Sequence, residues 1–371
     1  MQFGYYIAKK LSFRQGKSFT RTITYLAITA LSISICIVLI AFGILLGFKK
    51  EIREKVTGYA GDINVIAYQL TSGNESALIT YKASTQDTLR AIDQVKDVQP
   101  YLHKAGILKT DSVLEGLIFK GVGSAYNLGF YKTYLTKGSL PLYTDSSDSY
   151  DILLSEHTAS ILDLDTGKRL DLFFVIDGNV RRRKPKISGI YNTGLQEFDK
   201  QFAICDLRML QRIVGNDYSS ISGYEISLKD FDEVDIVARE VKRRLEYQLT
   251  ALTAKENYPT LFQWLEIVDT NVLVIIVLMF VVAAINIITV LLILIIDRIP
   301  MIGTLKSLGA RHSQISSIFN WQGLYIIMGG LIAGNSIGLI FGYLQSHYKL
   351  ISLSADTYYM DAVPFYLPWW V

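Results

Sequence analysis

Arg181, Arg182, Arg183 and Lys184 are four consecutive cations that could bind an acidic partner. The preceding Asp177-Gly-Asn is typical of a turn, and strands are expected at 170–176 and 187–191, so the cations should lie on a hairpin. Adjacent cations repel one another unless an anionic group is near. The run is therefore either a docking patch for an acidic protein or lipid headgroups, or a charged turn in solvent.

The other reactive side chains lack the spacing of a catalytic or metal site. No G-x-x-x-x-G-K-[ST] pattern occurs, so the chain has no P-loop to hold ATP phosphates. Cys36 and Cys205 fall in different segments and are not expected to pair. The histidines show no metal-ligand spacing; they are His103, His157, His312 and His347. We expect no catalytic residue, cofactor or metal in this chain, and the net charge of +3 gives no reason to expect nucleic acid.

Three long apolar segments should position whatever site the chain has. Each exceeds the roughly 20 residues that a helix needs to cross a bilayer, and the first is too long for a signal peptide. Basic residues near the spans place the N-terminal tail and the short loop in the cytoplasm. The expected segments are a cytoplasmic tail at 1–21, spans at 22–48, 270–296 and 313–346, an extracytoplasmic domain at 49–269, a cytoplasmic loop at 297–312 and an outer segment at 347–371.

The outer segment ends in aromatic residues, Pro364–Val371, which are typical of a membrane interface. We expect it to lead towards a fourth span missing from a truncated sequence. A short aromatic tail on the membrane is the alternative.

The loop at 297–312 is short, basic and amphipathic. Pro300 suits a helix start, and Gly309 suits a helix end. Met301, Ile302, Leu305 and Leu308 form an apolar face. The loop is thus predicted to be a helix parallel to the membrane. It either rests on the bilayer or is moved by a partner.

Glycines recur every fourth residue in two spans. Stripes of small residues let helices approach closely in lipid, so we expect helix packing rather than binding. The positions are Gly43 and Gly47 in the first span, and Gly330, Gly334, Gly338 and Gly342 in the third.

The outer domain is predicted to be α+β with two lobes. Strands are expected at 62–67, 98–109, 112–122, 222–228 and 248–254, and helices at 85–95 and 231–247. The β-rich stretch at about 150–205 would form an inserted lobe. An amphipathic segment at 258–267 either lies on the membrane or runs directly into the second span.

Several ordered motifs resemble FtsX-type ABC transporter permeases, above all the lipoprotein-releasing LolC/LolE family. The similar stretches are Phe42–Phe48, Gly116–Val122, Ile152–Ser155, Tyr258–Trp264, Ile302–Ala310 and Gln322-Gly323. The resemblance implies an outer domain of the MacB/LolC periplasmic core type, four spans and a multi-pass protein of the bacterial inner membrane.

The resemblance also implies partners and roles. Members form permease homo- or heterodimers with a separate dimer of ATPase subunits, which binds ATP and Mg. The loop helix would couple to that ATPase through Pro300, Met301, Ile302, Gly303, Leu305, Lys306, Leu308, Gly309 and Ala310. Lipoprotein cargo would pass to a periplasmic chaperone. The Arg181–Lys184 hairpin resembles a chaperone-binding hook but looks shorter. The alternatives are MacB-like efflux, FtsX-like activation of cell-wall hydrolases, and a membrane-anchored sensor without an ATPase.

Overall fold

A computed structural model describes residues 19–68, 77–110, 113–176, 178–215, 218–353, 360 and 362–368. The tail at 1–18 and Asp177, which the sequence predicts to begin a turn, therefore lie outside the described residues. The chain divides into two units. The membrane unit comprises Met1–Lys50, Gln263–Ser352 and Ala362–Val371, and the outer unit comprises Glu51–Phe262 and Leu353–Asp361.

Long helices make up the membrane unit. In the described part of the chain, three stretches are long and apolar enough to cross a membrane, and they lie in the helices predicted from sequence. The helices are α2 (Phe19–Ala60), α10 (Pro259–Asp297), α11 (Ile299–Ser307) and α12 (His312–Tyr348). Ala27, Val290 and Ile326 form a small buried cluster where α2, α10 and α12 meet.

Two of these helices are longer than their apolar spans. α2 continues past Lys50 to Ala60, and α10 begins at Pro259, so each passes without a break from one unit into the other. The segment at 258–267 therefore runs directly into the second span. Its Pro259 occupies a helix start, where a missing N–H costs nothing.

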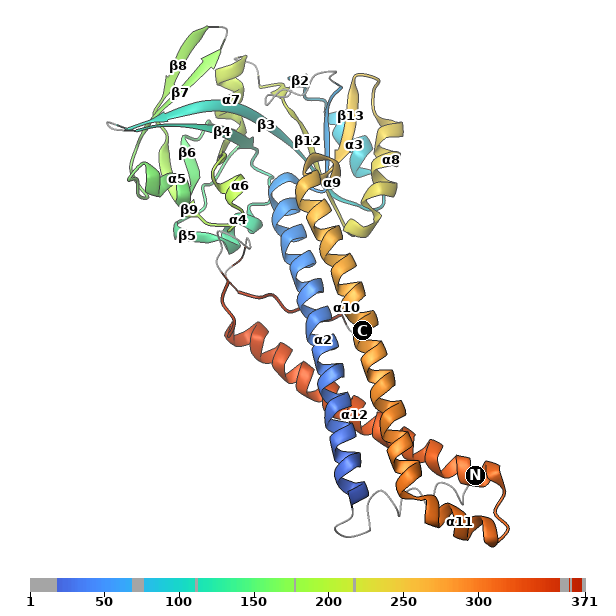
Figure 1. Ribbon diagram of the computed structural model, residues 1–371. Coiled ribbons are helices and arrows are strands. Elements are labelled where there is room, and N and C mark those ends of the chain that lie inside the picture. Colours follow the sequence, from blue (N-terminus) through green and yellow to red (C-terminus); the bar gives the residue numbers. More distant parts are fainter. Residues whose placement is uncertain are drawn as a thin grey trace. The chain divides into compact units, whose positions relative to one another are not determined.

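A mixed β-sheet forms the centre of the outer unit (Figure 1). Among the described residues eleven strands join it, in the main order β13-β1-β12-β3-β4-β10-β6-β9-β5, with β7 paired to β3 and β8. These strands are β1 (Ile63–Ala67), β3 (Val95–Lys109), β4 (Leu114–Val122), β5 (Leu135–Gly138), β6 (Asp151–Ser155), β7 (Asp171–Ile176), β8 (Asn179–Arg183), β9 (Lys186–Tyr191), β10 (Phe202–Asp206), β12 (Gly223–Leu228) and β13 (Leu249–Thr253). β2 (Ile79–Thr80) and β11 (Ser220–Ile221) form a separate pair.

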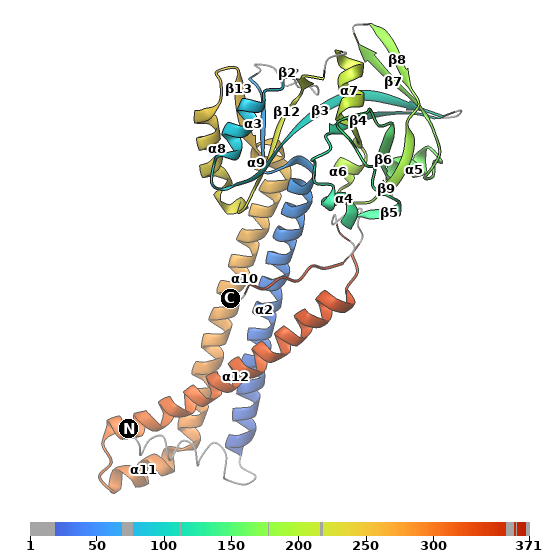
Figure 2. The same cartoon turned by 180° about the vertical axis from the view of Figure 1, so that it is seen from behind.

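The long β3–β4 pair joins two halves of this sheet. β3 pairs with β12 near its start and with β7 near its end, while β4 pairs with β10 (Figure 2). The first half therefore contains β13, β1 and β12, and the second contains β10, β6, β9, β5, β7 and β8. The predicted α+β architecture is confirmed, with β4–β10 and β6–β9 as parallel pairs.

Short helices cover the sheet and complete the core. α3 and α8 pack beside β3 and β13, α7 packs on β3 and β4, and α5 packs on β6 and β9. The helices are α3 (Ala83–Arg90), α4 (Gly129–Thr133), α5 (Glu156–Ile161), α6 (Gln196–Asp199), α7 (Leu207–Val214), η1 (Phe231–Glu233), α8 (Val234–Arg244) and α9 (Ala254–Asn257). The helix predicted at 85–95 ends at Arg90, because Val95 already pairs with Leu228 as the start of β3.

Candidate functional site

The loop between α10 and α12 folds into the short helix α11. Pro300 lies in its first turn, as predicted. At its end Gly309 has φ of +85°, a left-handed conformation that glycine adopts without strain. The Ala310 N–H donates to the Leu305 carbonyl and the Gly309 N–H to the Lys306 carbonyl, each at 3.0 Å. This is a Schellman cap, which satisfies carbonyls that the helix end would leave unpaired.

The side chains of α11 remain largely uncovered. Met301, Ile302 and Leu305 are half-buried, whereas Gly303 and Lys306 are exposed, and Leu308 keeps 79% of its surface exposed. No residue of α11 is fully buried. Among the described residues, α11 is therefore a capped helix whose apolar side chains are only partly covered.

The glycine stripe of α12 packs against α2 within the membrane unit. An added Cβ at Gly330 would lie 2.6 Å from Leu31 Cδ2, and one at Gly334 would lie 2.7 Å from the Ser32 carbonyl oxygen. At Gly338 the nearest atom would be Leu39 Cδ2 at 2.8 Å. The glycines thus permit close helix contact in lipid.

The first-span glycines pack against the segment after α12. Phe365 lies where a Cβ at Gly43 or at Gly342 would be, and the backbone of Pro364 approaches Gly47. The Tyr366 N–H donates to the Gly43 carbonyl at 3.0 Å. Both stripes therefore pack within the chain, and part of the aromatic segment packs against α2 and α12.

Three of the four cations at Arg181–Lys184 occupy a strand and not the hairpin turn. Arg181, Arg182 and Arg183 belong to β8, which pairs antiparallel with β7, so the cations lie on a hairpin, as predicted. The arginines form its second strand and not its turn, and Lys184 follows directly after that strand. Arg182 forms an ion pair with Asp171 of β7 at 2.5 Å, and the Lys184 ammonium lies 3.9 Å from the same carboxylate. Arg181 donates to the Ile213 carbonyl. A carboxylate on the neighbouring strand thus supplies the anionic partner that the charge repulsion calls for.

Sequence reasoning missed a buried ion pair beside the end of α2. Lys120 of β4 and Glu225 of β12 are joined at 2.6 Å, with side chains 0% and 5% exposed. Lys120 also donates to the carbonyl of Tyr59 and, at 2.9 Å, to the Tyr126 hydroxyl. The Tyr126 hydroxyl donates to the other Glu225 oxygen at 2.9 Å. A charged residue inside an otherwise apolar strand, as in LIFKGV and GYEISL, is the sequence signal that could have found this pair.

Burial sets the electrostatics around this pair. Desolvation lowers the pKa of the Lys120 ammonium, and the Glu225 carboxylate opposes that change. His103 lies opposite Lys120 on β3. Burial, assisted by the Lys120 charge, lowers the His103 pKa to about 3, so this imidazole is neutral at physiological pH.

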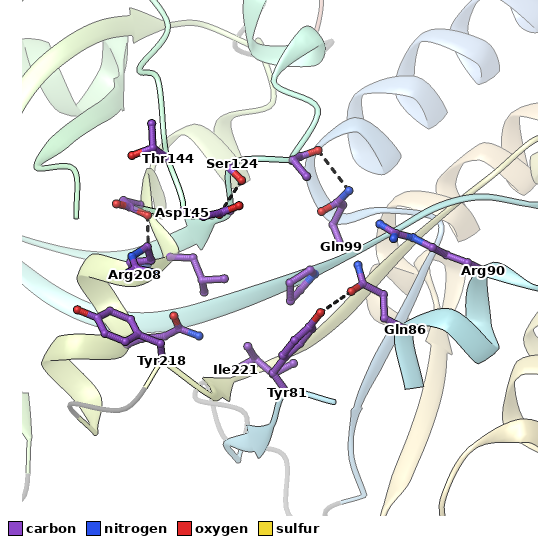
Figure 3. A pocket seen from close by; sticks show the side chains of 16 residues that line it. Tyr81, Gln86, Arg90, Gln99, Ser124, Thr144, Asp145, Arg208, Tyr218 and Ile221 are labelled. Atoms are coloured by element: carbon purple, nitrogen blue, oxygen red, sulfur yellow. Dashed lines mark hydrogen bonds between the residues drawn. The ribbon is translucent and has the colours of Figure 1, made fainter. Parts of the chain in front are cut away.

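A polar cleft opens elsewhere in the outer unit, with a volume of about 400 Å³ (Figure 3). Within it the Ser124 hydroxyl donates to Asp145 at 2.7 Å, and the Tyr81 hydroxyl donates to Gln86 at 2.8 Å. The Arg208 guanidinium lies over the Tyr218 ring. These polar groups are thus bonded to one another, and among the described residues no His, Cys, Asp and Glu cluster could hold a metal.

The structure thus combines apolar helices of membrane-spanning length with a large mixed α/β domain. Residues 24–244 match the MacB-like periplasmic core domain, and residues 273–371 match the FtsX-like permease C-terminal domain. The chain belongs to the family of permeases that carry a MacB-like periplasmic core domain, since that match alone covers more than half of its length. It is therefore of the ABC permease subunit type, and its outer unit corresponds to the periplasmic core domain.

Similar proteins include the lipoprotein-releasing system transmembrane protein LolC of Xylella fastidiosa, 20% identical over 95% of this chain and 86% of that protein. LolE of Haemophilus influenzae is 20% identical over 91% of this chain and 84% of that protein. The crystal structure of the periplasmic region of MacB from Actinobacillus actinomycetemcomitans matches with a TM-score of 0.40 and 13% identity, over 55% of this chain and 95% of that one.

Proposed function

We propose that this chain is the permease subunit of an ATP-driven transporter that releases lipoproteins from the bacterial inner membrane to a periplasmic chaperone. The names of the LolC and LolE relatives support lipoprotein release. The observation that carries the proposal is α11, a capped helix with uncovered apolar surface between two long apolar helices. Such a helix suits a partner that pushes on it.

The partner we propose is a cytoplasmic ATPase dimer, which would bind ATP and Mg. No P-loop occurs among the residues of the sequence, and we propose that this partner carries out the hydrolysis. Pro300–Ala310 would seat against the ATPase, with Met301, Ile302 and Leu305 as its apolar contacts. ATPase closure would then move α11, and the unbroken helix α10 would carry that motion to the outer unit.

A second permease, identical or related, would complete the transporter. We propose that the N-terminal tail and α11 face the cytoplasm and that the outer unit lies in the periplasm. The cationic strand β8 is the proposed chaperone contact. Asp171 forms ion pairs with Arg182 and Lys184. Among the ion pairs of the described residues none involves Arg183, which donates to the Arg182 carbonyl, so its positive charge could attract an acidic surface.

Co-purification of an ATPase tests the proposal directly. Leu305→Asp puts a charge into the proposed contact, and we expect about a 30-fold or larger loss of bound ATPase, as for a central interface residue. Leu114→Asp, on an exposed position of β4, is the matched control and should retain the ATPase. A wild-type chain that co-purifies with no ATPase would refute the transporter assignment in favour of a membrane-anchored sensor.

Cross-linking decides what the transporter acts on. The family descriptions also name MacB and FtsX, which favours efflux or hydrolase activation as the second candidate function. We expect photo-cross-links from the outer unit to trap lipid-modified proteins, with a yield that depends on ATP. Cross-links that trap only a cell-wall hydrolase or an unmodified substrate, with ATPase binding intact, would favour the second candidate.

A further inference from the structure

We propose that Lys120 and Glu225 form a latch that fixes the C-terminal end of α2 to the sheet, so that both halves of the outer unit follow the end of this helix. The latch is the Lys120–Glu225 pair together with the Tyr126 hydroxyl. Its role in transport rests on the proposed function. Its geometry lies wholly within the outer unit.

The end of α2 is held by its own carbonyl groups. A helix leaves its last four carbonyls without partners inside the helix. Gly61 donates to the Thr57 carbonyl at 2.8 Å, and the Asn64 side chain donates to the Ala60 carbonyl at 2.9 Å. Lys120 donates to the Tyr59 carbonyl between them. Its positive charge thus lies at the negative end of the helix dipole, where a cation is favourable.

The latch spans the joint between the two halves of the sheet. Lys120 lies on β4 and Glu225 on β12, with β3 between these strands. Their neighbours on β3 are His103 and Gln99, respectively. One hydrogen-bonded group therefore ties the helix end to strands from both halves.

Side chains of α2 also contact both halves of the outer unit. The Tyr59 ring packs against Phe198 and Phe202 of the second half, with centroids 4.7 and 4.8 Å apart. Arg53 forms an ion pair with Asp232 of the first half at 3.1 Å. The last turns of α2 thus contact both halves, and the proposed latch would fix their orientation.

Burial makes this pair an inefficient source of stability. Removing two charges from water costs free energy that their attraction only partly returns, and apolar residues of similar size are often as stable. Buried pairs can instead select one arrangement among several. A pair at the end of a helix that enters from the membrane unit would prevent the helix end from turning independently of the sheet.

The test separates stability from coupling. In the double variant Lys120→Met with Glu225→Leu, both charges are replaced by apolar groups, so no buried charge is left unpaired. The full chain with its ATPase is reconstituted in liposomes. ATP-dependent lipoprotein release, ATP hydrolysis, thermal unfolding and hydrogen exchange at Glu51–Ala60 are then measured. Val122→Ala, which removes buried methyl groups on the same strand, is the control for simple loss of packing.

We expect release per ATP hydrolysed to fall about tenfold in the double variant, within the range typical of coupling between two sites. Its unfolding temperature should stay near or above that of Val122→Ala, whose release per ATP should be unchanged. Exchange at the end of α2 should rise only in the double variant. Release that stays at the wild-type level, or falls equally in Val122→Ala, overturns the latch.

The experiment gives different results if the proposed function is wrong and if the latch is wrong. If the wild-type chain releases no lipoprotein, the function is wrong, but the exchange measurement still judges the latch. Unchanged exchange at Glu51–Ala60 in the double variant refutes the latch whatever the cargo is.

Discussion

Two single-methyl substitutions, one within α11 and one just after its end, test whether the shape of this helix, and not only its surface, couples it to a partner. Gly309→Ala puts a side chain on a residue with φ of +85°, while Gly303→Ala puts one inside the helix. An added Cβ meets no atom within 4 Å at either position. Both variants therefore add the same group in open space, and only the backbone conformation differs.

The expected effects have opposite signs. A non-glycine residue in the left-handed region costs about 1–2 kcal/mol, so Gly309→Ala weakens the cap at Leu308–Ala310. Alanine in a helix interior is favoured over glycine by about 1 kcal/mol, so Gly303→Ala strengthens α11. Because 1–2 kcal/mol is about a 5- to 30-fold change in an equilibrium, hydrogen exchange of the 309 and 310 amides should quicken by that factor in Gly309→Ala.

The affinity of each variant for the ATPase then tests whether binding requires the capped conformation of α11. If the partner must find the capped helix already formed, Gly309→Ala should weaken binding by a similar factor, while Gly303→Ala leaves it unchanged or tighter. Equal weakening by both variants would mean that the methyl groups obstruct a contact surface, and the argument from helix shape would fail. Unchanged exchange in Gly309→Ala would refute the cap itself.

Two further predictions concern the outer unit. Burial raises the pKa of Asp62 from 3.8 to about 6, so the folded state binds a proton more tightly than the unfolded state between these values. Its contribution to the free energy of unfolding therefore falls by up to about 3 kcal/mol as pH rises from about 4 to above 6. Asp62→Asn keeps an acceptor for the Leu228 N–H. In denaturant unfolding, the stability of this variant relative to the wild type should therefore increase as pH rises from about 4 to above 6. A stability difference that does not depend on pH would contradict this prediction. Replacing Arg181–Lys184 with Ser removes exposed ion pairs, which water screens strongly, so the free energy of unfolding should change little. Capture of a soluble acidic partner should weaken and lose its salt dependence, with ATPase binding intact; unchanged capture would leave β8 as an ordinary charged strand.

The amino-acid sequence alone specified the three long helices and the bounds of α11, because the signals for these elements lie within their own residues. An apolar stretch longer than a bilayer has one stable solution in lipid, so the three long helices could be predicted without any tertiary information. Pro300 and Gly309 bound α11 for the same reason, since proline and glycine act through their own backbone angles. The ordered motifs in turn indicated the permease family.

Tertiary structure decided what each charged and small residue contacts. The sequence predicts a hairpin at Arg181–Lys184, but only strand pairing shows that the three arginines lie in β8, with Asp171 of β7 beside them. The glycine stripes predicted close packing, yet only the fold shows that Phe365 fills the space at Gly43 and Gly342. Such partners lie far apart in the chain, and no local pattern specifies them.

The Lys120–Glu225 pair shows most clearly which contacts cannot be predicted from local sequence. More than a hundred residues separate them in the printed sequence. Each alone is an anomalous charge in an apolar strand. They meet only because β12, β3 and β4 are neighbours in one sheet and because α2 ends beside them. Burial of a charge is tolerated only when a partner is supplied at that point, and the sheet topology, not the local sequence, supplies it.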